Sequence, residues 1–399
     1  MNRGVDMAEN LAVKKMIKDT FVEIADSIEK GDFGRKMRVG LTILGSEHGT
    51  ENLIKGAELA ASRLTDTEIV LIGPENNSNI ETVAVDNEKE MHSKMEEILD
   101  DGFIDACVTM HYNFPIGVST VGRVVVPGTG KEMIIASTTG TSSMNRTEAM
   151  TRNALHGIIA AKAIGIEEPT VGILNLDGAR QVDRLLNELK AGGYDISLGE
   201  SARADGGVVM RGNDLLCGSV DVMVTDTLTG NILMKMFSSY TTGGSYEASG
   251  YGYGPGVGED YGRSILILSR ASGIPVVANA IEYASCLARG GLGGIARDEF
   301  EKAGKAGLKE LIKEGTKEKN ETSVEFVEEP EKEIATGTLS GIDIMELEEA
   351  VKALWQAGIY AESGMGCTGP VVMVNEEKIK KAADVLIEKG YMAKESSPC

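Results

Sequence analysis

The chain has 399 residues, 42% of them hydrophobic and 25% charged, and this balance excludes a polypeptide that is disordered throughout. Its formal net charge of −21 argues against partners that are themselves polyanions, such as nucleic acid and anionic membrane surfaces. Glycine is frequent, with 49 residues and no collagen repeat, which indicates many turns and close backbone contacts.

The first part of the chain has the pattern of a helix. Residues 8–30 show the apolar spacing of an amphipathic helix. The surrounding segment 1–36 carries seven acidic and seven basic residues, so it adds nothing to the net charge. We interpret 1–36 as an N-terminal helical segment that packs on the rest of the chain or acts as a dimer arm.

Between residues 37 and 315, short apolar runs alternate with helical patterns. Strands separated by helices indicate βαβ units and a mainly parallel sheet, whose strands are continuously apolar because both faces are buried. We therefore predict an α/β core over 37–315. The expected strands are 38–44, 68–73, 82–86, 105–110, 133–138, 170–175, 195–200, 221–226 and 274–279, and the expected helices include 51–64, 89–102, 148–165 and 179–193.

The stretch 299–349 is strongly acidic, with 15 acidic and 7 basic residues. Its first half suits a charged surface helix. We interpret 316–340 as an acidic linker, because it has little apolar periodicity. The segment 341–399 reads as a compact C-terminal unit with a helix over 342–359, an interrupted strand over 359–375 and a closing helix over 376–391.

Cysteine and histidine usage provides neither a metal site nor a disulfide framework. The five cysteines form no C-x-x-C pair, and the four histidines do not cluster, so we interpret each histidine as a structural or surface residue. The N-terminus has no apolar signal core, and no window of 18 apolar residues occurs. We therefore expect a cytoplasmic protein with reduced thiols and no metal.

Several common catalytic motifs are absent, since the chain has no complete P-loop, no G-x-S-x-G elbow and no H-E-x-x-H. The stretch 243–262 is unusual, with eight Gly and four Tyr in twenty residues. It lacks the strand–turn–helix setting of a dinucleotide-binding fingerprint. Two interpretations of it stay open, a mobile active-site loop and a simple flexible loop.

One expected strand end carries residues suited to binding an anion. In DTLTGNILMK a buried strand is expected to end at Asp226, Thr229 and Gly230 to form a turn, and a helix to begin near Asn231. Ligands of open α/β sheets bind beyond the carboxyl ends of strands, and helix N-termini offer free N–H groups to anions. Asn231 can donate from its amide, and Lys235 follows about one helical turn later. A simple helix cap at Asp226 stays open as the alternative.

Two further strand ends have the same character. In ILILSRAS the apolar run is followed by Ser269 and Arg270, and an arginine there can clamp phosphate with two hydrogen bonds while the serine adds a hydroxyl. The stretch 137–146 follows another expected strand with small hydroxyl residues and ends in Arg146. Together the three strand ends predict a site for phosphate or a similar anion.

Cys367 differs from the other cysteines in its surroundings. It stands in ESGMGCTGPVV, where Gly364, Gly366 and Gly369 remove side-chain bulk around the sulfur. Backbone N–H groups of such a turn can stabilise a thiolate or the oxyanion of a thioester. The alternative is a buried small hydrophobe, as most free cysteines are. We favour a functional thiol.

These motifs resemble the alpha subunits of component C of the glycine/sarcosine/betaine reductase complex. That family is related to the PlsX-type phosphate acyltransferases and, more distantly, to the phosphotransacetylases. DTLTGNILMK resembles a PlsX-type segment, LSRAS a phosphotransacetylase site, and AESGMGCTGPVV the reductase subunit itself. The resemblance implies a two-lobed α/β/α sandwich of the isocitrate/isopropylmalate dehydrogenase-like type, with an N-terminal helix and a small C-terminal α/β unit.

The resemblance also implies an activity, the phosphorolysis of a protein-bound acetyl thioester to acetyl phosphate. Inorganic phosphate is then a substrate, and no cofactor is needed. Cys367 matches the family's acyl-carrying thiol, and Asn231 and Lys235 are the other implied catalytic residues. The implied phosphate-binding residues are Asp226, Thr229, Gly230, Ser269 and Arg270. The implied partners are the component C beta subunit and a selenoprotein, component A, in an oligomeric assembly.

One position departs from the resemblance. Phosphotransacetylases carry an acidic residue shortly after the Ser-Arg pair, where this chain has Val276, so a general base is not expected there. Two alternative functions stay open. One is a free-standing phosphate acyltransferase that uses coenzyme A or acyl carrier protein, for which Cys367 is dispensable. The other is a non-catalytic docking subunit of the reductase. A metal-dependent dehydrogenase has less support, because no acidic triad is apparent.

Overall fold

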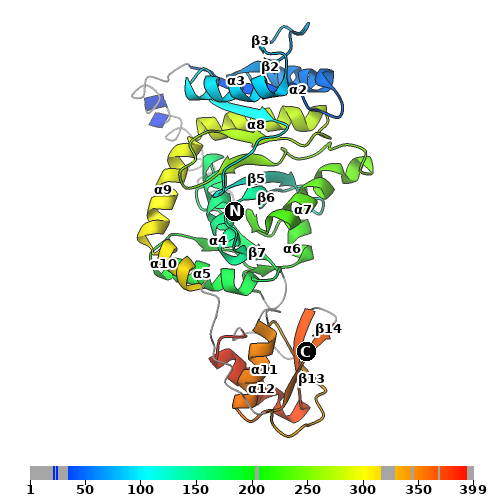
Figure 1. Ribbon diagram of the computed structural model, residues 1–399, viewed down its shortest axis with the longest axis vertical. Helices are drawn as coiled ribbons and strands as arrows, with labels where there is room; N and C mark the ends of the chain where they lie inside the picture. Colours follow the sequence, from blue (N-terminus) through cyan, green and yellow to red (C-terminus); the bar gives the residue numbers. More distant parts are fainter. Residues whose placement is uncertain are drawn as a thin grey trace, which may run out of the picture.

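The computed structural model describes residues 21–22, 24–25, 35–202, 206–315, 329–342, 346–366 and 369–392. These residues form a large sheet in the body of the molecule and a three-stranded sheet in a C-terminal unit (Figure 1). Within the predicted helix 8–30, the described residues 21–22 and 24–25 are helical, and the remainder of that prediction lies outside the described residues.

The large sheet has the strand order β3-β2-β1-β4-β12-β11-β5-β6-β10-β7-β8, and β9 also pairs with β7. The strands expected between residues 38 and 226 are confirmed, with shifted ends. The strands are β1 (Met37–Thr42), β2 (Thr67–Gly73), β3 (Glu81–Ala84), β4 (Ala106–Thr109), β5 (Val118–Val125), β6 (Glu132–Thr141), β7 (Thr170–Leu174), β8 (Ser197–Leu198), β9 (Val209–Met210), β10 (Val222–Val224), β11 (Gly254–Val257) and β12 (Ile265–Ile267).

Pairing directions divide this sheet into two parallel halves. Strands β3, β2, β1, β4 and β12 are parallel, and so are β6, β10, β7, β8 and β9. Between the halves, β11 pairs antiparallel with β12 and β5, and β5 pairs antiparallel with β6. The predicted α/β fold with a mainly parallel sheet is confirmed, and β11 and β5 join its two halves.

Helices flank both halves of the sheet. Figure 1 shows α2, α3 and α8 at the end that carries β2 and β3, whereas α4, α5, α9 and α10 lie further toward the C-terminal unit. The four helices predicted in the first half of the core are confirmed as α2 to α5. The helices of the body are α2 (Thr50–Arg63), α3 (Glu88–Asp100), α4 (Arg146–Ala163), α5 (Ala179–Ala191), α6 (Gly212–Cys217), α7 (Thr227–Ser239), the short η1 (Tyr240–Thr242), α8 (Ile274–Arg289), α9 (Leu292–Lys305) and α10 (Leu308–Gly315).

One predicted strand is wrong. The apolar run 274–279 is the start of helix α8, with Pro275 in the first turn, where a missing N–H is tolerated. The run is continuously apolar because this helix is deeply buried. Val276 and Val277 are fully buried, and a Cβ placed on Gly56 of α2 would lie 2.5 Å from the Val277 side chain. A short apolar run alone does not distinguish a buried helix from a strand.

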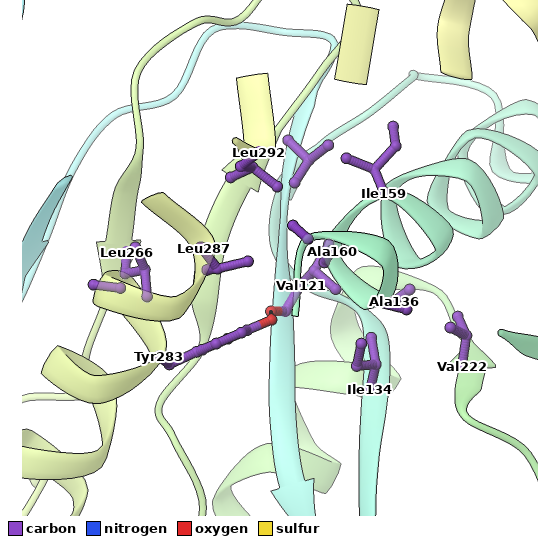
Figure 2. Close-up of a cluster of buried hydrophobic side chains, with 14 of the residues drawn as sticks. Val121, Ile134, Ala136, Ile159, Ala160, Val222, Leu266, Tyr283, Leu287 and Leu292 are labelled. Carbon is purple, nitrogen blue, oxygen red and sulfur yellow. Dashed lines mark hydrogen bonds between the residues drawn. The ribbon is translucent and has the colours of Figure 1, made fainter. Parts of the chain in front are cut away.

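The main hydrophobic core draws side chains from both halves of the sheet. Figure 2 shows Tyr283 and Leu287 of α8 near Val121 of β5, with Ile134 and Val222 from the other half close by. The hydroxyl of fully buried Tyr283 donates to the carbonyl of Val121 at 3.4 Å. Because each fully buried large apolar side chain stabilises the fold by about 1.5–3 kcal/mol, this shared core holds the two halves together.

The C-terminal unit has a core of its own. Its antiparallel sheet has the order β13-β15-β14, and its helices confirm the two predicted there. Arg184 of α5 connects the unit to the body, since its guanidinium lies 2.5 Å from Glu346 Oε1 and donates to the carbonyl of Gly390 at 3.2 Å. The elements are β13 (Gly337–Ser340), α11 (Leu347–Gln356), β14 (Ala361–Gly366), β15 (Gly369–Val374), η3 (Glu376–Lys378) and α12 (Ile379–Glu388).

Two predictions for this region need comment. The interrupted strand over 359–375 is a pair of antiparallel strands, with Gly366 paired to Gly369. Cys367, which stands between them in the sequence, lies outside the described residues. Of the predicted linker 316–340, residues 316–328 also lie outside the described residues, and 337–340 form β13.

Candidate functional site

A cavity of about 610 Å³ opens at the carboxyl ends of the parallel strands β4 and β12. This is the edge at which open α/β sheets bind ligands. The cavity is lined by residues 110–114 after β4 and 267–271 at the end of β12, by Thr139 and Gly140 of β6, by Asn231 and Lys235 of α7, and by Glu47 and Tyr253.

Helix α7 begins earlier than the sequence predicted. Its first residue is Thr227, and Asp226 is the N-cap, whose carboxylate accepts from the Thr229 N–H at 2.8 Å and from the Thr229 hydroxyl at 3.1 Å. The predicted turn and the helix start near Asn231 are therefore wrong, and the helix-cap alternative describes the local structure. An N-cap aspartate satisfies N–H groups that have no partner within the helix.

Gly230 brings α7 unusually close to the sheet. A Cβ at this position would lie 1.7 Å from the carbonyl oxygen of Ser137 in β6, so no larger residue fits without a shift of the backbone. The next residue, Asn231, donates from its amide to the Thr138 carbonyl at 3.1 Å. This close packing places Asn231 and Lys235 at the wall of the cavity.

Lys235 is the centre of a small polar group. Its ammonium lies 3.5 Å from Ser269 Oγ, 3.7 Å from Glu247 Oε1 and 5.7 Å from the centre of the Tyr253 ring. Ser269 is buried and accepts from the Ala271 N–H at 3.2 Å. Burial and then the charge of Glu247 raise the pKa of Tyr253, so this phenol remains neutral at physiological pH.

Arg270 follows Ser269 and is exposed at the cavity. Its backbone carbonyl accepts from the Glu47 N–H at 2.9 Å, which ties the turn after β12 to the loop after β1. Within the described parts of the chain, no carboxylate lies within ion-pair distance of its guanidinium. Arg270 therefore has its hydrogen-bond donors available to an anion.

Aromatic residues form another part of the cavity wall. Tyr112 and Phe114 pack edge to face with ring centres 5.0 Å apart. The Tyr112 hydroxyl donates to Glu96 at 2.8 Å and accepts from Arg263 at 3.2 Å. Burial, followed by this contact with Glu96, raises the pKa of Tyr112. This part of the wall is thus aromatic, and the contacts with Glu96 and Arg263 hold Tyr112 in place.

The structure brings some of the predicted site residues together and not others. The cavity lining includes Asn231, Lys235, Ser269 and Arg270. Asp226, Thr229 and Gly230 do not line the cavity and instead form the start of α7.

The two remaining predicted residues are Arg146 and Cys367. Arg146, expected at a strand end, pairs with Asp226 at 2.6 Å and with Asp177 at 3.6 Å. Cys367 lies outside the described residues.

Sequence reasoning singled out neither Glu247 nor Tyr253, although an active-site role for the stretch 243–262 was one of its two open interpretations. Both belong to the glycine- and tyrosine-rich stretch 243–262, which is not a loop throughout, because β11 forms over 254–257 in the middle of the sheet. The signal was present in the composition: a tyrosine next to close-packed glycines suggests a ring held against a ligand site. No sequence pattern links Glu247 to Lys235.

A family model described as "Fatty acid synthesis protein" matches residues 37–373. The alpha subunit of component C of the glycine/sarcosine/betaine reductase complex from Peptoclostridium acidaminophilum is 63% identical over 382 residues, which cover 96% of this chain and 99% of that protein. The chain belongs to the fatty acid synthesis protein family and, within it, to the component C alpha subunits. The resemblance inferred from the three motifs is confirmed.

Two more distant proteins are similar to part of the chain. A phosphate acyltransferase from Thermotoga maritima is 28% identical over 237 residues, covering 50% of this chain and 68% of that enzyme. A crystal structure of a branched-chain phosphotransacylase from Enterococcus faecalis V583 aligns with 63% of this chain and 99% of its own, with a TM-score of 0.45 and 15% identity. Among the described helices, none is long and apolar enough to cross a membrane.

Proposed function

We propose that this chain transfers an acyl group from a thioester to inorganic phosphate. The observation that carries the proposal is the cavity, where the Lys235 ammonium, the Arg270 guanidinium and the Ser269 hydroxyl line one space. Guanidinium and hydroxyl groups such as those of Arg270 and Ser269 can bind phosphate, an arginine with two parallel hydrogen bonds, and an ammonium such as that of Lys235 can stabilise negative charge that develops in the reaction. The site is local, which reconciles an anionic substrate with a chain of net charge −21.

In the proposed reaction, a phosphate oxygen attacks the carbonyl carbon of the thioester. A C–O bond forms, the C–S bond breaks, and the thiolate leaves with the electron pair and takes a proton from solvent. Arg270 and Ser269 hold the phosphate in attack position, which supplies the proximity effect. Lys235 and Asn231 stabilise the negative charge on the carbonyl oxygen of the tetrahedral intermediate. Asp226, Thr229 and Gly230 serve by positioning α7.

The acyl donor in this proposal is an acetyl thioester on Cys367, and the product is acetyl phosphate. The support is the high identity to a reductase component C alpha subunit and the glycine-rich sequence around this cysteine. The chain then works in a glycine/sarcosine/betaine reductase complex. Its partners are the beta subunit of component C and the selenoprotein component A, which supplies the two-carbon unit.

The size of the cavity favours a second candidate, a phosphate acyltransferase that uses acyl-coenzyme A or acyl carrier protein. A space of about 610 Å³ is far larger than phosphate and an acetyl group need, and it falls in the range of sites for whole small-molecule ligands. The aromatic wall with Tyr112 and Phe114 can receive the arm of a carrier. Cys367 is dispensable in that reaction.

The test is the intact mass of this chain after incubation of the complete reductase complex with its acetyl donor. We expect one acetyl group on the wild-type chain without phosphate, its loss when phosphate is added, and formation of acetyl phosphate. Cys367→Ala should abolish all three, and Cys217→Ala, at an exposed cysteine, serves as the control.

The alternatives give different results in the same experiment. Unchanged acetyl phosphate formation by Cys367→Ala, together with turnover of acetyl-coenzyme A by the chain alone, would establish the second candidate. Binding to the complex without acetyl phosphate formation in any arm would show a non-catalytic docking subunit.

A further inference from the structure

Glu247 is held against the turn that carries Ser269 and Arg270. Its N–H donates to the Ala271 carbonyl at 2.9 Å, and its own carbonyl accepts from the Gly273 N–H at 2.8 Å. Through these two hydrogen bonds, both the N–H and the carbonyl of Glu247 are bound to the segment that follows Arg270. The backbone of Glu247 is therefore fixed beside this turn, and its carboxylate contacts the Ser272 hydroxyl and the Lys235 ammonium.

The carboxylate of Glu247 is buried but incompletely hydrogen-bonded. The residue is 3% exposed. Its Oε2 accepts from the Ser272 hydroxyl at 3.1 Å, whereas Oε1 has no hydrogen-bond partner among the described residues. The Lys235 ammonium lies 3.7 Å from Oε1. A buried anion needs a countercharge, and Lys235 supplies it here.

Lys235 in turn is placed by its contacts with acceptors. An ammonium group has three N–H donors. One reaches Ser269 Oγ at 3.5 Å, whereas Glu247 Oε1, at 3.7 Å, is within ion-pair distance but makes no hydrogen bond, and the Tyr253 ring centre lies 5.7 Å from the nitrogen. The remaining donors are left for a ligand in the cavity, which Lys235 lines. Among the described residues, Glu247 is the one charged group that pairs with the flexible lysine side chain, which is 56% exposed.

We propose that Glu247 is a positioning residue of this site, which fixes the Lys235 ammonium beside Ser269 and acts on the reaction through Lys235. This inference rests on the proposed function. The negative charge of Glu247 opposes the binding of phosphate, whereas its hold on Lys235 assists the chemical step. Neutralising it should separate the two effects.

Glu247→Gln tests this separation, because it keeps the shape and removes the charge. We expect kcat for acyl phosphate formation to fall roughly 10- to 100-fold, as a displaced catalytic group does, while KM for phosphate stays constant or falls. The matched control is Glu299→Gln, at another buried glutamate, which pairs with Lys162 at 3.0 Å and does not line the cavity. It should lower Tm and leave both kinetic constants unchanged.

A double variant tests the route of the effect. If Glu247 acts through Lys235, Glu247→Gln combined with Lys235→Met should have the kcat of Lys235→Met alone. Losses that multiply in the double variant would overturn the proposal. So would a Glu247→Gln enzyme whose kcat is unchanged, or one whose phosphate KM rises in step with a fall in kcat.

A stability measurement tests the pairing without any activity. Lys235→Met removes the countercharge of a buried carboxylate, so it should lower Tm more than Lys305→Met, which affects an exposed pair with Glu301. Adding Glu247→Gln should restore part of the Tm lost in Lys235→Met. Equal losses without restoration would overturn the pairing. A wild-type protein that forms no acyl phosphate but shows this restoration would overturn the proposed function and keep the pairing.

Discussion

A buried glutamate lies beside helix α7 and another lies within helix α9, and the two carboxylates are bound very differently. Glu299 of α9 receives the Tyr194 hydroxyl at 2.7 Å, the Lys302 ammonium at 2.8 Å and the Lys162 ammonium at 3.0 Å. Glu247, beside α7, has one hydroxyl donor and a lysine at 3.7 Å. A fully satisfied carboxylate anchors a helix, whereas an incompletely satisfied one at a cavity leaves its lysine available to a ligand.

The same contrast applies to the glycines of the two helices. A Cβ on Gly230 of α7 would lie 1.7 Å from a backbone carbonyl, and a Cβ on Gly304 of α9 would meet nothing within 4 Å. The α7 glycine therefore serves close packing against the sheet beneath the cavity, and the α9 glycine has no such role.

The largest effect expected is on stability. Gly230→Ala should lower the free energy of unfolding by about 3 kcal/mol or more, because the clash is with rigid backbone. Gly304→Ala should raise it by up to about 1 kcal/mol, because alanine is the better helix former. Urea denaturation of both variants measures the difference. Similar changes in the free energy of unfolding would contradict the different roles assigned to the two glycines.

The next effect concerns the cations of the cavity. Arg270→Met should lower kcat/KM for phosphate roughly 100-fold, since it removes a charged donor to the reacting anion. The matched control is Arg289→Met, because Arg289 pairs with Asp66 at 2.6 Å in an exposed ion pair of small energetic value. Steady-state kinetics with varied phosphate separates them. An equal loss of kcat/KM in both variants would show that Arg270 does not bind the reacting phosphate.

The smallest effect expected is a pH dependence of stability, and it concerns a histidine that packs against α9. His156 of α4 packs edge to face on Phe300, and its Nδ1 lies 2.8 Å from Ser119 Oγ. Burial, and then the charge of Arg152, lower the pKa of His156 to about 3. Between pH 6.5 and 3, the unfolded chain binds a proton here that the folded chain does not, so stability falls as the pH falls.

From pH 6.5 to 5 this histidine should remove about 2 kcal/mol of the free energy of unfolding. His156→Gln should lose less stability than wild type over that interval, measured by urea denaturation at both pH values. Identical pH dependence in the two proteins would show that His156 is not a source of acid sensitivity.

His156 also limits what an unsatisfied group signifies. Its Nε2 has no hydrogen-bond partner in the described chain, as with Glu247 Oε1, yet His156 does not line the cavity. An unsatisfied buried atom therefore points to a site only when a cavity and a matching charge accompany it. Glu247 meets both conditions through Lys235.

Sequence patterns predicted the parallel strands well, because strands buried on both faces leave continuous apolar runs. They did not predict β5 and β11, the antiparallel strands that join the halves. Strand β11 is the four-residue segment GPGV in a glycine-rich stretch and has no apolar run to detect. The prediction for 274–279 was wrong for the opposite reason, because this segment is continuously apolar but forms the start of a helix.

The residues of the cavity were likewise predictable only where the sequence carries a recognisable pattern. Ser269, Arg270 and Lys235 could be predicted to lie close together because each follows a recognisable strand and carries a donor for anions, and the three line one cavity. Glu247 was missed because its partnership with Lys235 depends on packing between segments, which spacing along the chain does not encode. The sequence was compatible with two roles for Asp226, anion binding and helix capping. The hydrogen bonds that it accepts from Thr229 show that it is a helix cap.

We propose that phosphate attacks an acyl thioester in the cavity at Lys235, Ser269 and Arg270. The most direct measurement supplies isotopically labelled inorganic phosphate to the complete reductase complex with its acetyl donor, containing either the wild-type chain or Arg270→Met. We predict labelled acetyl phosphate with the wild type and roughly 100-fold less with the variant, which should still carry the acetyl thioester. Equal labelling in both, or acetyl thioester that no phosphate discharges, would contradict the claim.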